Sequence, residues 1–187
     1  MSRIEVRLAG FGGQGIILAG IILGRAIAVY GGKNATQVQS YGPEARGGTC
    51  RSEVVASDEQ IDYPSVIEAD ALVAMSQEAA DNFARNIKKG GLLIVDPTLV
   101  KLQELPNIRV YKIPATEIAM REFRRGVVAN MIMLGALTAL TNITTEDAVR
   151  RSLKESVPKG TEEINLKAFE IGLKSANEVI GQARAQL

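Results

Sequence analysis

The feature that most constrains this chain is a glycine-rich segment close to its start. The six residues of this segment are Gly10, Phe11, Gly12, Gly13, Gln14 and Gly15. An apolar run, residues 4–8, precedes it, and a long apolar stretch, residues 16–30, follows it. This order predicts a strand, a tight turn and a helix, because glycine tolerates positive φ and lets a ligand approach bare backbone.

The glycines at positions 10, 12 and 15 match the G-x-G-x-x-G pattern in its strand-to-helix context. The free N–H groups and the dipole at such a helix start favour phosphate. An NAD site also needs an acidic residue roughly 20 residues further on. Residues 35–40 contain no acid, and Glu44 comes later, inside a loop. We therefore predict a phosphate cradle for a coenzyme other than an ordinary dinucleotide; the alternative is a turn that serves only helix–sheet packing.

A second segment rich in turn-forming residues spans residues 41–48. Its candidate binding residues are Tyr41, Gly42, Pro43, Glu44 and Arg46. The segment follows a predicted strand, residues 34–40, and loops at the carboxyl ends of strands bind ligands in open α/β sheets. We expect a ligand site or a subunit contact here, and a solvated surface turn is the alternative.

The composition excludes several classes of function. The chain contains no histidine, so histidine bases, histidine triads and histidine metal sites are excluded. Its one cysteine, Cys50, is expected in the core and cannot hold an iron–sulfur cluster alone. A net charge of +1 and 4% aromatic residues argue against nucleic acid as a partner. Neither a signal peptide nor a bilayer-spanning run is found, so a soluble, cytoplasmic protein without a membrane partner is expected.

Strand-like and helix-like runs alternate along the chain. The expected strands are residues 4–8, 34–40, 49–56, 71–74, 92–95 and 108–113, and the expected helices are 14–30, 64–69, 77–87, 116–123, 127–140, 144–157 and one after residue 160. Apolar strands that alternate with helices predict an α/β fold with a doubly wound, mostly parallel sheet and C-terminal helices. We expect one domain, residues 1–187, with the sheet in about 1–115 and a helical part in about 116–187.

Helix ends and isolated polar residues give further expectations. Ser76, Thr116 and a Thr144–Asp147 capping box are predicted to begin helices, and residues 90–91, both glycine, to end one. Asn130 lies in an otherwise apolar helix, so its amide needs a partner in the fold or at an interface. A basic cluster precedes Gly126 and fits either a solvated surface or an anionic ligand. It consists of Arg121, Arg124 and Arg125.

The two glycine-rich segments together closely resemble the gamma subunit of 2-oxoacid:ferredoxin oxidoreductases. The matching motifs are residues 10–15 (GFGGQG) and 40–48 (SYGPEARGG). The similarity continues through residues 62–64 (DYP), 75–79 (MSQEA) and 130–135 (NMIMLG), so it covers essentially the whole chain. Residues 45–48 (ARGG) look most like the 2-oxoglutarate enzymes, while pyruvate, branched-chain and aryl-pyruvate versions remain open.

The resemblance implies a Rossmann-like domain in a multisubunit enzyme that decarboxylates a 2-oxoacid, reduces ferredoxin and transfers the acyl group to coenzyme A. Thiamine diphosphate, magnesium and iron–sulfur clusters would then belong to alpha, beta and delta-type partner subunits, because this chain has no thiamine-diphosphate signature. It would contribute coenzyme A binding and assembly through the two glycine-rich segments and hold no catalytic residue. We infer separately, from the charges alone, that Arg46, or Arg124 and Arg125, would supply the neutralising cations. A purely structural scaffold and a stand-alone nucleotide-dependent oxidoreductase are the alternatives.

Overall fold

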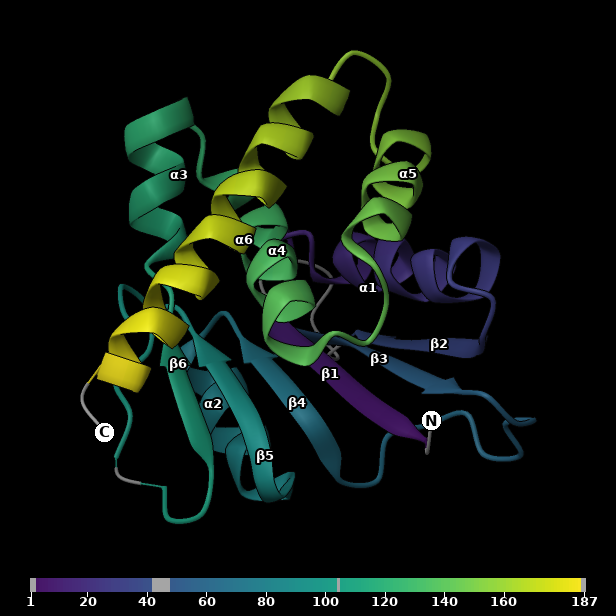
Figure 1. Cartoon of the computed structure of the whole chain (residues 1–187). Helices are drawn as coiled ribbons and strands as arrows, with labels where there is room; N and C mark the ends of the chain where they lie inside the picture. Colours follow the sequence, from purple (N-terminus) through teal and green to yellow (C-terminus); the bar gives the residue numbers. More distant parts are fainter. Residues whose placement is uncertain (1–2, 42–47, 104, 186–187) are drawn as a thin grey trace.

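The computed structural model describes residues 3–41, 48–103 and 105–185, which form a six-stranded sheet flanked by helices (Figure 1). The strands are β1 (Ile4–Phe11), β2 (Asn34–Tyr41), β3 (Thr49–Ser57), β4 (Ala69–Ala74), β5 (Ile87–Val95) and β6 (Arg109–Lys112). Their spatial order is β2-β3-β1-β4-β5-β6. Only β3 runs against its neighbours, while β1, β4, β5 and β6 pair in parallel. The predicted mostly parallel sheet is confirmed.

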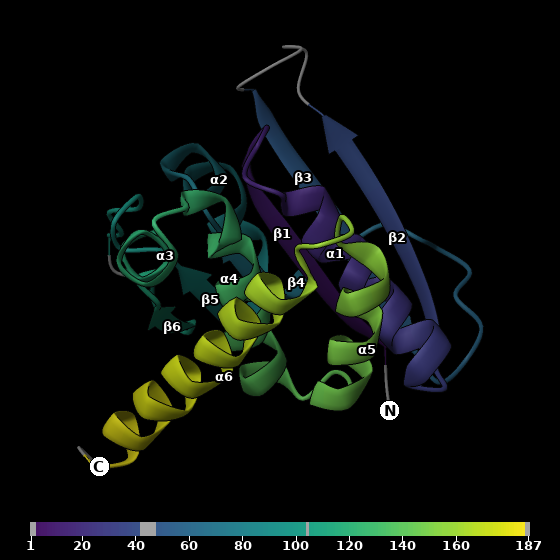
Figure 2. The same cartoon turned by 90° about the horizontal axis from the view of Figure 1, so that it is seen from above.

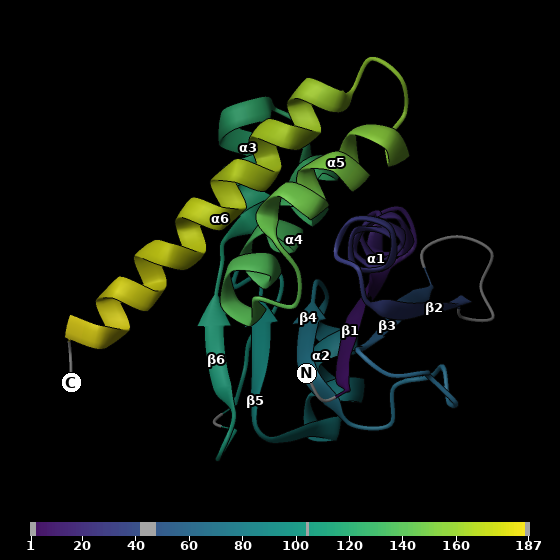
Figure 3. The same cartoon turned by 45° about the vertical axis from the view of Figure 1, so that its right-hand side comes forward.

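Helices cover both faces of this sheet. They are α1 (Ile16–Arg25), which continues as a π-helical turn η1 (Ala26–Tyr30), α2 (Gln77–Phe83) with the 3₁₀ turn η2 (Ala84–Asn86), α3 (Ala115–Phe123), η3 (Gly126–Val128), α4 (Ala129–Thr141), α5 (Glu146–Ser156) and α6 (Glu162–Ala185). The helices α1 and α4 lie on one face and α2 lies on the other (Figures 1 and 3). Outside them, α5 packs on α1 and α6 packs on α4 (Figure 2). The doubly wound arrangement and the C-terminal helices are therefore as predicted.

The helix α1 lies close to the sheet because two glycines face it. A Cβ at Gly20 would lie 1.9 Å from Oγ of Ser52, and one at Gly24 would lie 3.4 Å from Cβ of Gln37. The Gln37 amide also donates a hydrogen bond to the Ser52 hydroxyl over 2.7 Å. Apolar residues on nearly every side of α1 follow from this position between the strands and α5.

The helices α4 and α6 cross with their backbones almost in contact. A Cβ at Gly135 would lie 2.2 Å from the carbonyl oxygen of Phe169, and one at Gly172 would lie 2.0 Å from that of Ile132. Residues 129–138 of α4 are all buried, because the helix lies between the sheet and α6. This double cover explains why the α4 sequence is almost entirely apolar.

A buried ion pair lies on the sheet face opposite α1. The side chains of Arg7 in β1 and Glu53 in β3 are each 6% exposed, and Nε of Arg7 lies 2.8 Å from Oε1 of Glu53. The Arg7 guanidinium also stacks over the ring of Phe83, 4.9 Å from its centroid. The other Glu53 oxygen accepts a hydrogen bond from the N–H of Val66 over 3.3 Å. Carboxylates of the sheet therefore bind the backbone of the segment that crosses this face.

The prediction of a helix in that segment, residues 64–69, was wrong. No helix forms over residues 64–69; instead the N–H of Val66 bonds to Glu53 and the N–H of Ile67 bonds to Glu5 over 2.9 Å. These side-chain acceptors replace the helical backbone bonds that the sequence suggested. The C-terminal end of α2 was also wrong, because the buried Ile87 pairs with Ala69 and begins β5. The glycines at 90 and 91 lie within β5 rather than after a helix.

Two predicted helix caps differ in the structure: a distant residue supplies the acceptor for α3, and the cap of α5 lies one residue later than predicted. The N–H of Thr116 donates to the buried carboxylate of Asp96 over 2.7 Å, so Asp96 supplies the acceptor at the start of α3. The cap of α5 is Thr145, whose hydroxyl accepts from the N–H of Ala148 over 3.2 Å, and not Thr144. The predicted Ser76 cap of α2 is confirmed.

Candidate functional site

The glycine loop between β1 and α1 has a backbone that other residues would strain. Gly13 has φ +96° and Gly15 has φ +76°, both in the left-handed region that favours glycine. A Cβ at Gly13 would meet open space, whereas one at Gly15 would lie 2.2 Å from Nδ2 of Asn130. Gly12 and Gly13 are exposed and Phe11 is 37% exposed. The loop thus presents bare backbone at the carboxyl end of β1.

The side chain of Gln14 fixes the shape of this loop. Its Oε1 accepts the N–H of Phe11 over 2.7 Å, and its Nε2 donates to the carbonyl of Met75, just beyond β4, over 2.8 Å. A Cβ at Gly10 would lie 2.4 Å from the same Oε1. The Gln14 amide is therefore engaged within the fold, and Gly10 provides the room for it.

The N-terminus of α1 begins directly at the loop and has no side-chain cap. Gly15 is the N-cap residue, and the first turn contains no acidic side chain. The first helical bond runs from the N–H of Ala19 to the carbonyl of Gly15 over 3.0 Å. The N–H groups of residues 16–18 precede it and lack intrahelical acceptors, so this end of α1 favours an anion.

Asn130, in the first turn of α4, lies against the same helix start. Its Nδ2 donates to the carbonyl of Gly15 over 3.1 Å, and the residue is 3% exposed. Its Oδ1 is buried and has no hydrogen-bond partner among the described residues. A buried acceptor left unpaired costs about 1–3 kcal/mol, so a donor from water or a ligand is needed beside the loop.

Gly48, the last residue of the second segment, lies next to the glycine loop. The N–H of Gly12 donates to the carbonyl of Gly48 over 2.9 Å, and Phe11 pairs with Thr49 in the sheet. Tyr41, at the end of β2, is 64% exposed. The predicted residues Gly42, Pro43, Glu44 and Arg46 lie outside the described residues. Gly48 and the glycine loop thus meet where β1 ends.

The start of α4 lies beside the glycine loop because Asn130 contacts Gly15, and the corner between α3 and α4 directly precedes it. Arg124 and Arg125 at this corner are exposed and form no ion pair with any residue that the structure describes. Arg121 differs, because it pairs with Glu117 over 3.7 Å and with Glu122 over 2.9 Å. The predicted basic cluster therefore divides into one paired and two unpaired arginines.

Comparison with known proteins identifies the family. Residues 5–175 match the family model described as pyruvate ferredoxin/flavodoxin oxidoreductase. The 2-oxoglutarate synthase subunit KorC of Methanocaldococcus jannaschii is 56% identical over 95% of this chain and 96% of its own length. The chain belongs to the pyruvate ferredoxin/flavodoxin oxidoreductase family. The KorC subunit of Methanothermobacter marburgensis is 51% identical over 91% of this chain and 95% of its own length.

Solved structures of this oxidoreductase family have the same fold. The gamma subunit of a keto/oxoacid ferredoxin oxidoreductase from Geobacter sulfurreducens superposes with a TM-score of 0.87, at 40% identity, over 96% of this chain and 99% of its own. The 2-oxoglutarate:ferredoxin oxidoreductase of Magnetococcus marinus, solved with 2-oxoglutarate, coenzyme A and succinyl-CoA, gives 0.84 at 27% identity over 95% of this chain and 32% of its own. This chain is a subunit of a 2-oxoacid:ferredoxin oxidoreductase, as its sequence motifs implied.

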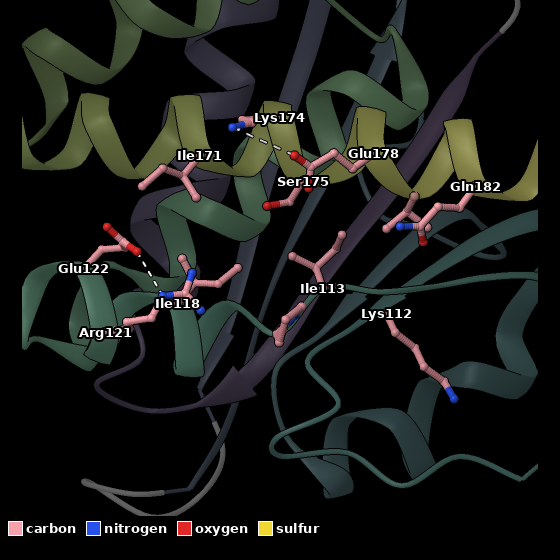
Figure 4. A pocket seen from close by; sticks show the side chains of 12 residues that line it. Lys112, Ile113, Ile118, Arg121, Glu122, Ile171, Lys174, Ser175, Glu178 and Gln182 are labelled. Atoms are coloured by element: carbon pink, nitrogen blue, oxygen red, sulfur yellow. Dashed lines mark hydrogen bonds and ion pairs between the residues drawn. The ribbon is translucent and has the colours of Figure 1, made fainter.

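A groove of about 460 Å³ lies away from the glycine loop of this oxidoreductase subunit, between α3 and the C-terminal half of α6 (Figure 4). Its apolar lining includes Ile118 and Ile171, and its charged rim is largely paired within the chain. Arg121 pairs with Glu122, and Lys174 pairs with Glu178 over 3.9 Å. The groove therefore offers no concentration of unpaired charge for an anionic coenzyme.

The described residues offer neither a metal-binding cluster nor a membrane-spanning helix. The described part of the chain contains no group of three or more acidic, cysteine or histidine side chains arranged to hold a metal ion. None of its helices is long and apolar enough to cross a membrane. Cys50 is 4% exposed, as predicted for a core residue, and burial raises the pKa of its thiol.

Two contacts that define the loop were missed by sequence reasoning. Gln14 was assigned as a candidate ligand residue, yet both ends of its amide bond to backbone groups of the chain. Asn130 was expected only to need some partner, and that partner is Gly15, 115 positions away. A polar residue isolated in an apolar helix was the one available signal for this contact.

Proposed function

We propose that this chain is the gamma subunit of a 2-oxoglutarate:ferredoxin oxidoreductase and that its glycine loop binds the phosphates of coenzyme A. The substrate assignment is supported by the KorC relatives, which are 2-oxoglutarate synthase subunits. The observation that carries the binding role is the uncapped start of α1, where Gly13 and Gly15 expose backbone next to the unpaired Oδ1 of Asn130.

Coenzyme A fits this arrangement through its pyrophosphate. The free N–H groups of the first turn of α1 and the exposed backbone at Gly13 would donate to phosphate oxygens. No carboxylate in that turn competes for these donors or repels the anion. The absence of an acid in residues 35–40 is no obstacle, because coenzyme A needs no acidic partner of the kind that binds the NAD ribose.

The chemistry at the 2-oxoacid is assigned to other subunits. In this proposal the chain binds coenzyme A and orients it, while thiamine diphosphate, magnesium and iron–sulfur clusters are bound by alpha, beta and delta-type partners that pass electrons to ferredoxin in the cytoplasm. The adjacent second segment would contact one of those partners. The exposed ring of Tyr41 supports this role, since large exposed aromatic side chains favour interfaces.

Calorimetry on the assembled enzyme tests the binding role. A valine at Gly13 would have a strained backbone and would project into the open space over the loop. Gly32→Val is the matched control, because Gly32 also has positive φ (+66°) and open space around it but precedes β2, at the opposite end of that strand from the second segment. We expect Gly13→Val to weaken coenzyme A binding by about tenfold or more, the loss of one phosphate contact, and Gly32→Val to leave it unchanged.

Three results would change this proposal. Unchanged coenzyme A affinity in an intact Gly13→Val complex would eliminate the cradle. Loss of assembly with unchanged affinity in the complex that still forms would indicate a structural scaffold instead. Ferredoxin reduction with pyruvate or a branched-chain or aryl 2-oxoacid, and not with 2-oxoglutarate, would replace the substrate assignment while leaving the binding role intact.

A further inference from the structure

We infer that Arg124 and Arg125 bind the 3′-phosphate of coenzyme A while the glycine loop binds its pyrophosphate, an inference that rests on the function proposed above. These two arginines would then determine specificity for coenzyme A over nucleotides that carry only a pyrophosphate. The inference depends on the backbone at Arg124, on the unpaired charge and on the position of the corner.

The backbone at Arg124 favours a residue other than arginine. Among the described residues, three that are not glycine have positive φ: Asn107 at 65°, Arg124 at 53° and Asn142 at 50°. Asparagine adopts this conformation readily, whereas arginine pays a steric cost there. Arg124 ends α3 through a backbone N–H bond to the carbonyl of Met120 over 3.1 Å, a bond that glycine or asparagine would make as well. The long cationic side chain therefore has no role in ending the helix.

The charges of these two residues also have no carboxylate partner within the described structure. Arg121 lies one helical turn earlier and is balanced by two glutamates, whereas Arg124 and Arg125 are exposed and without a carboxylate partner there. A guanidinium presents a planar fork of donors that matches a phosphate. Two adjacent unpaired guanidiniums suit the double negative charge of a phosphate monoester, which the 3′-phosphate is and the pyrophosphate is not.

The corner precedes the residue of α4 that contacts the glycine loop. Asn130 contacts Gly15, and Arg125 precedes Asn130 by five positions through the short turn η3. The corner and the start of α1 are therefore connected through Asn130. The inference places the pyrophosphate of one coenzyme A molecule at the start of α1 and its 3′-phosphate at the corner.

The test compares coenzyme A with 3′-dephospho-coenzyme A by calorimetry on the assembled enzyme. We expect Arg124→Gly and Arg125→Ala each to weaken coenzyme A binding by about tenfold, the loss of one charge-assisted contact, and to leave 3′-dephospho-coenzyme A unaffected. Gly13→Val should weaken both ligands. Arg121→Ala, which removes a paired arginine from the same corner, should change neither. Arg124→Gly should also melt at the same or a higher temperature than the parent, because glycine relieves the backbone.

Each result separates this inference from the proposed function. Equal affinity of the parent enzyme for the two ligands would overturn the arginine inference and leave the loop proposal standing, as would a uniform loss for both ligands in Arg124→Gly. A Gly13→Val enzyme that binds both ligands normally would overturn the loop proposal and, with it, the division of the two phosphates. An enzyme that binds neither ligand would overturn both.

Discussion

Because α4 and α6 cross so closely, adding one methyl group at Gly172 should force the two helices apart. A Cβ at Gly172 would lie 2.0 Å from the carbonyl oxygen of Ile132 and 2.8 Å from its carbon. Real Cβ contacts essentially never fall below 3.0 Å, so Gly172→Ala requires α6 to move outward by about 1 Å. Backbone atoms on both sides leave no rotamer change that could absorb the clash.

The size of the destabilisation follows from the gap that this movement opens between α4 and α6. Phe169 and Leu173 are 0% and 5% exposed, and they occupy the same interface. A gap of 0.5–1 Å forfeits roughly a quarter to a half of the dispersion energy of such contacts. With about 1.5–3 kcal/mol for each buried side chain, the loss is about 1–3 kcal/mol. Alanine returns up to about 1 kcal/mol through its helix propensity, so we expect a net destabilisation of up to about 2 kcal/mol.

Thermal unfolding of Gly172→Ala and Gly181→Ala measures this difference. Both glycines lie in α6, but a Cβ at Gly181 would meet nothing within 4 Å. Gly181→Ala should therefore gain stability from propensity alone, while Gly172→Ala should lower the melting temperature by up to about 8 °C. Equal stabilisation of the two variants would refute the close crossing and the reasoning built on it.

Three further predictions concern other parts of the chain. Glu53→Gln should destabilise the protein by about 3–5 kcal/mol in urea unfolding, because it leaves the Arg7 charge buried without its partner; stability equal to the parent would show that the pair is dispensable. The hydrogen bond between Tyr30 and Glu155 raises the pKa of the tyrosine and lowers that of the glutamate. The contact should therefore be lost as pH falls through the lowered pKa of Glu155 or rises through the raised pKa of Tyr30. In an NMR titration, Glu155→Gln should return the Tyr30 pKa toward its ordinary value. Cys50 should react with iodoacetamide far more slowly in the folded chain than in urea, since it is 4% exposed and burial disfavours its thiolate; equal rates would contradict its burial.

The sequence predicted those elements whose structure depends on residues close together in the chain. The strand, glycine turn and helix at the N-terminus were predictable, because left-handed backbone at Gly13 and Gly15 demands glycine whatever surrounds it. The Ser76 cap of α2 was predictable for the same reason, since its acceptor and the Ala79 donor are three residues apart. Apolar alternation also separated strands from helices along most of the chain.

Contacts between distant residues could not be predicted in this way. Residues 64–69 had the composition of a short helix, but Glu5 and Glu53 bind backbone N–H groups of that segment from two strands. Ile87 pairs with Ala69 in the sheet instead of ending a helix, which depends on the strand order. The closeness of Asn130 to the glycine loop likewise depends on how α4 packs, and a single sequence carries no signal for that pairing.

The ion pair between Arg7 and Glu53 also limits how the chain can assemble. Side chains in a strand alternate between faces, so a slip of β3 by one residue against β1 would turn Glu53 into the apolar layer beneath α1 and leave Arg7 unmatched. The charged pair therefore adds an energetic penalty to this one-residue misalignment. Correct alignment is also what places the carbonyl of Gly48 opposite the N–H of Gly12. The salt bridge thus disfavours a one-residue slip and favours the strand alignment in which Gly48 meets the glycine loop.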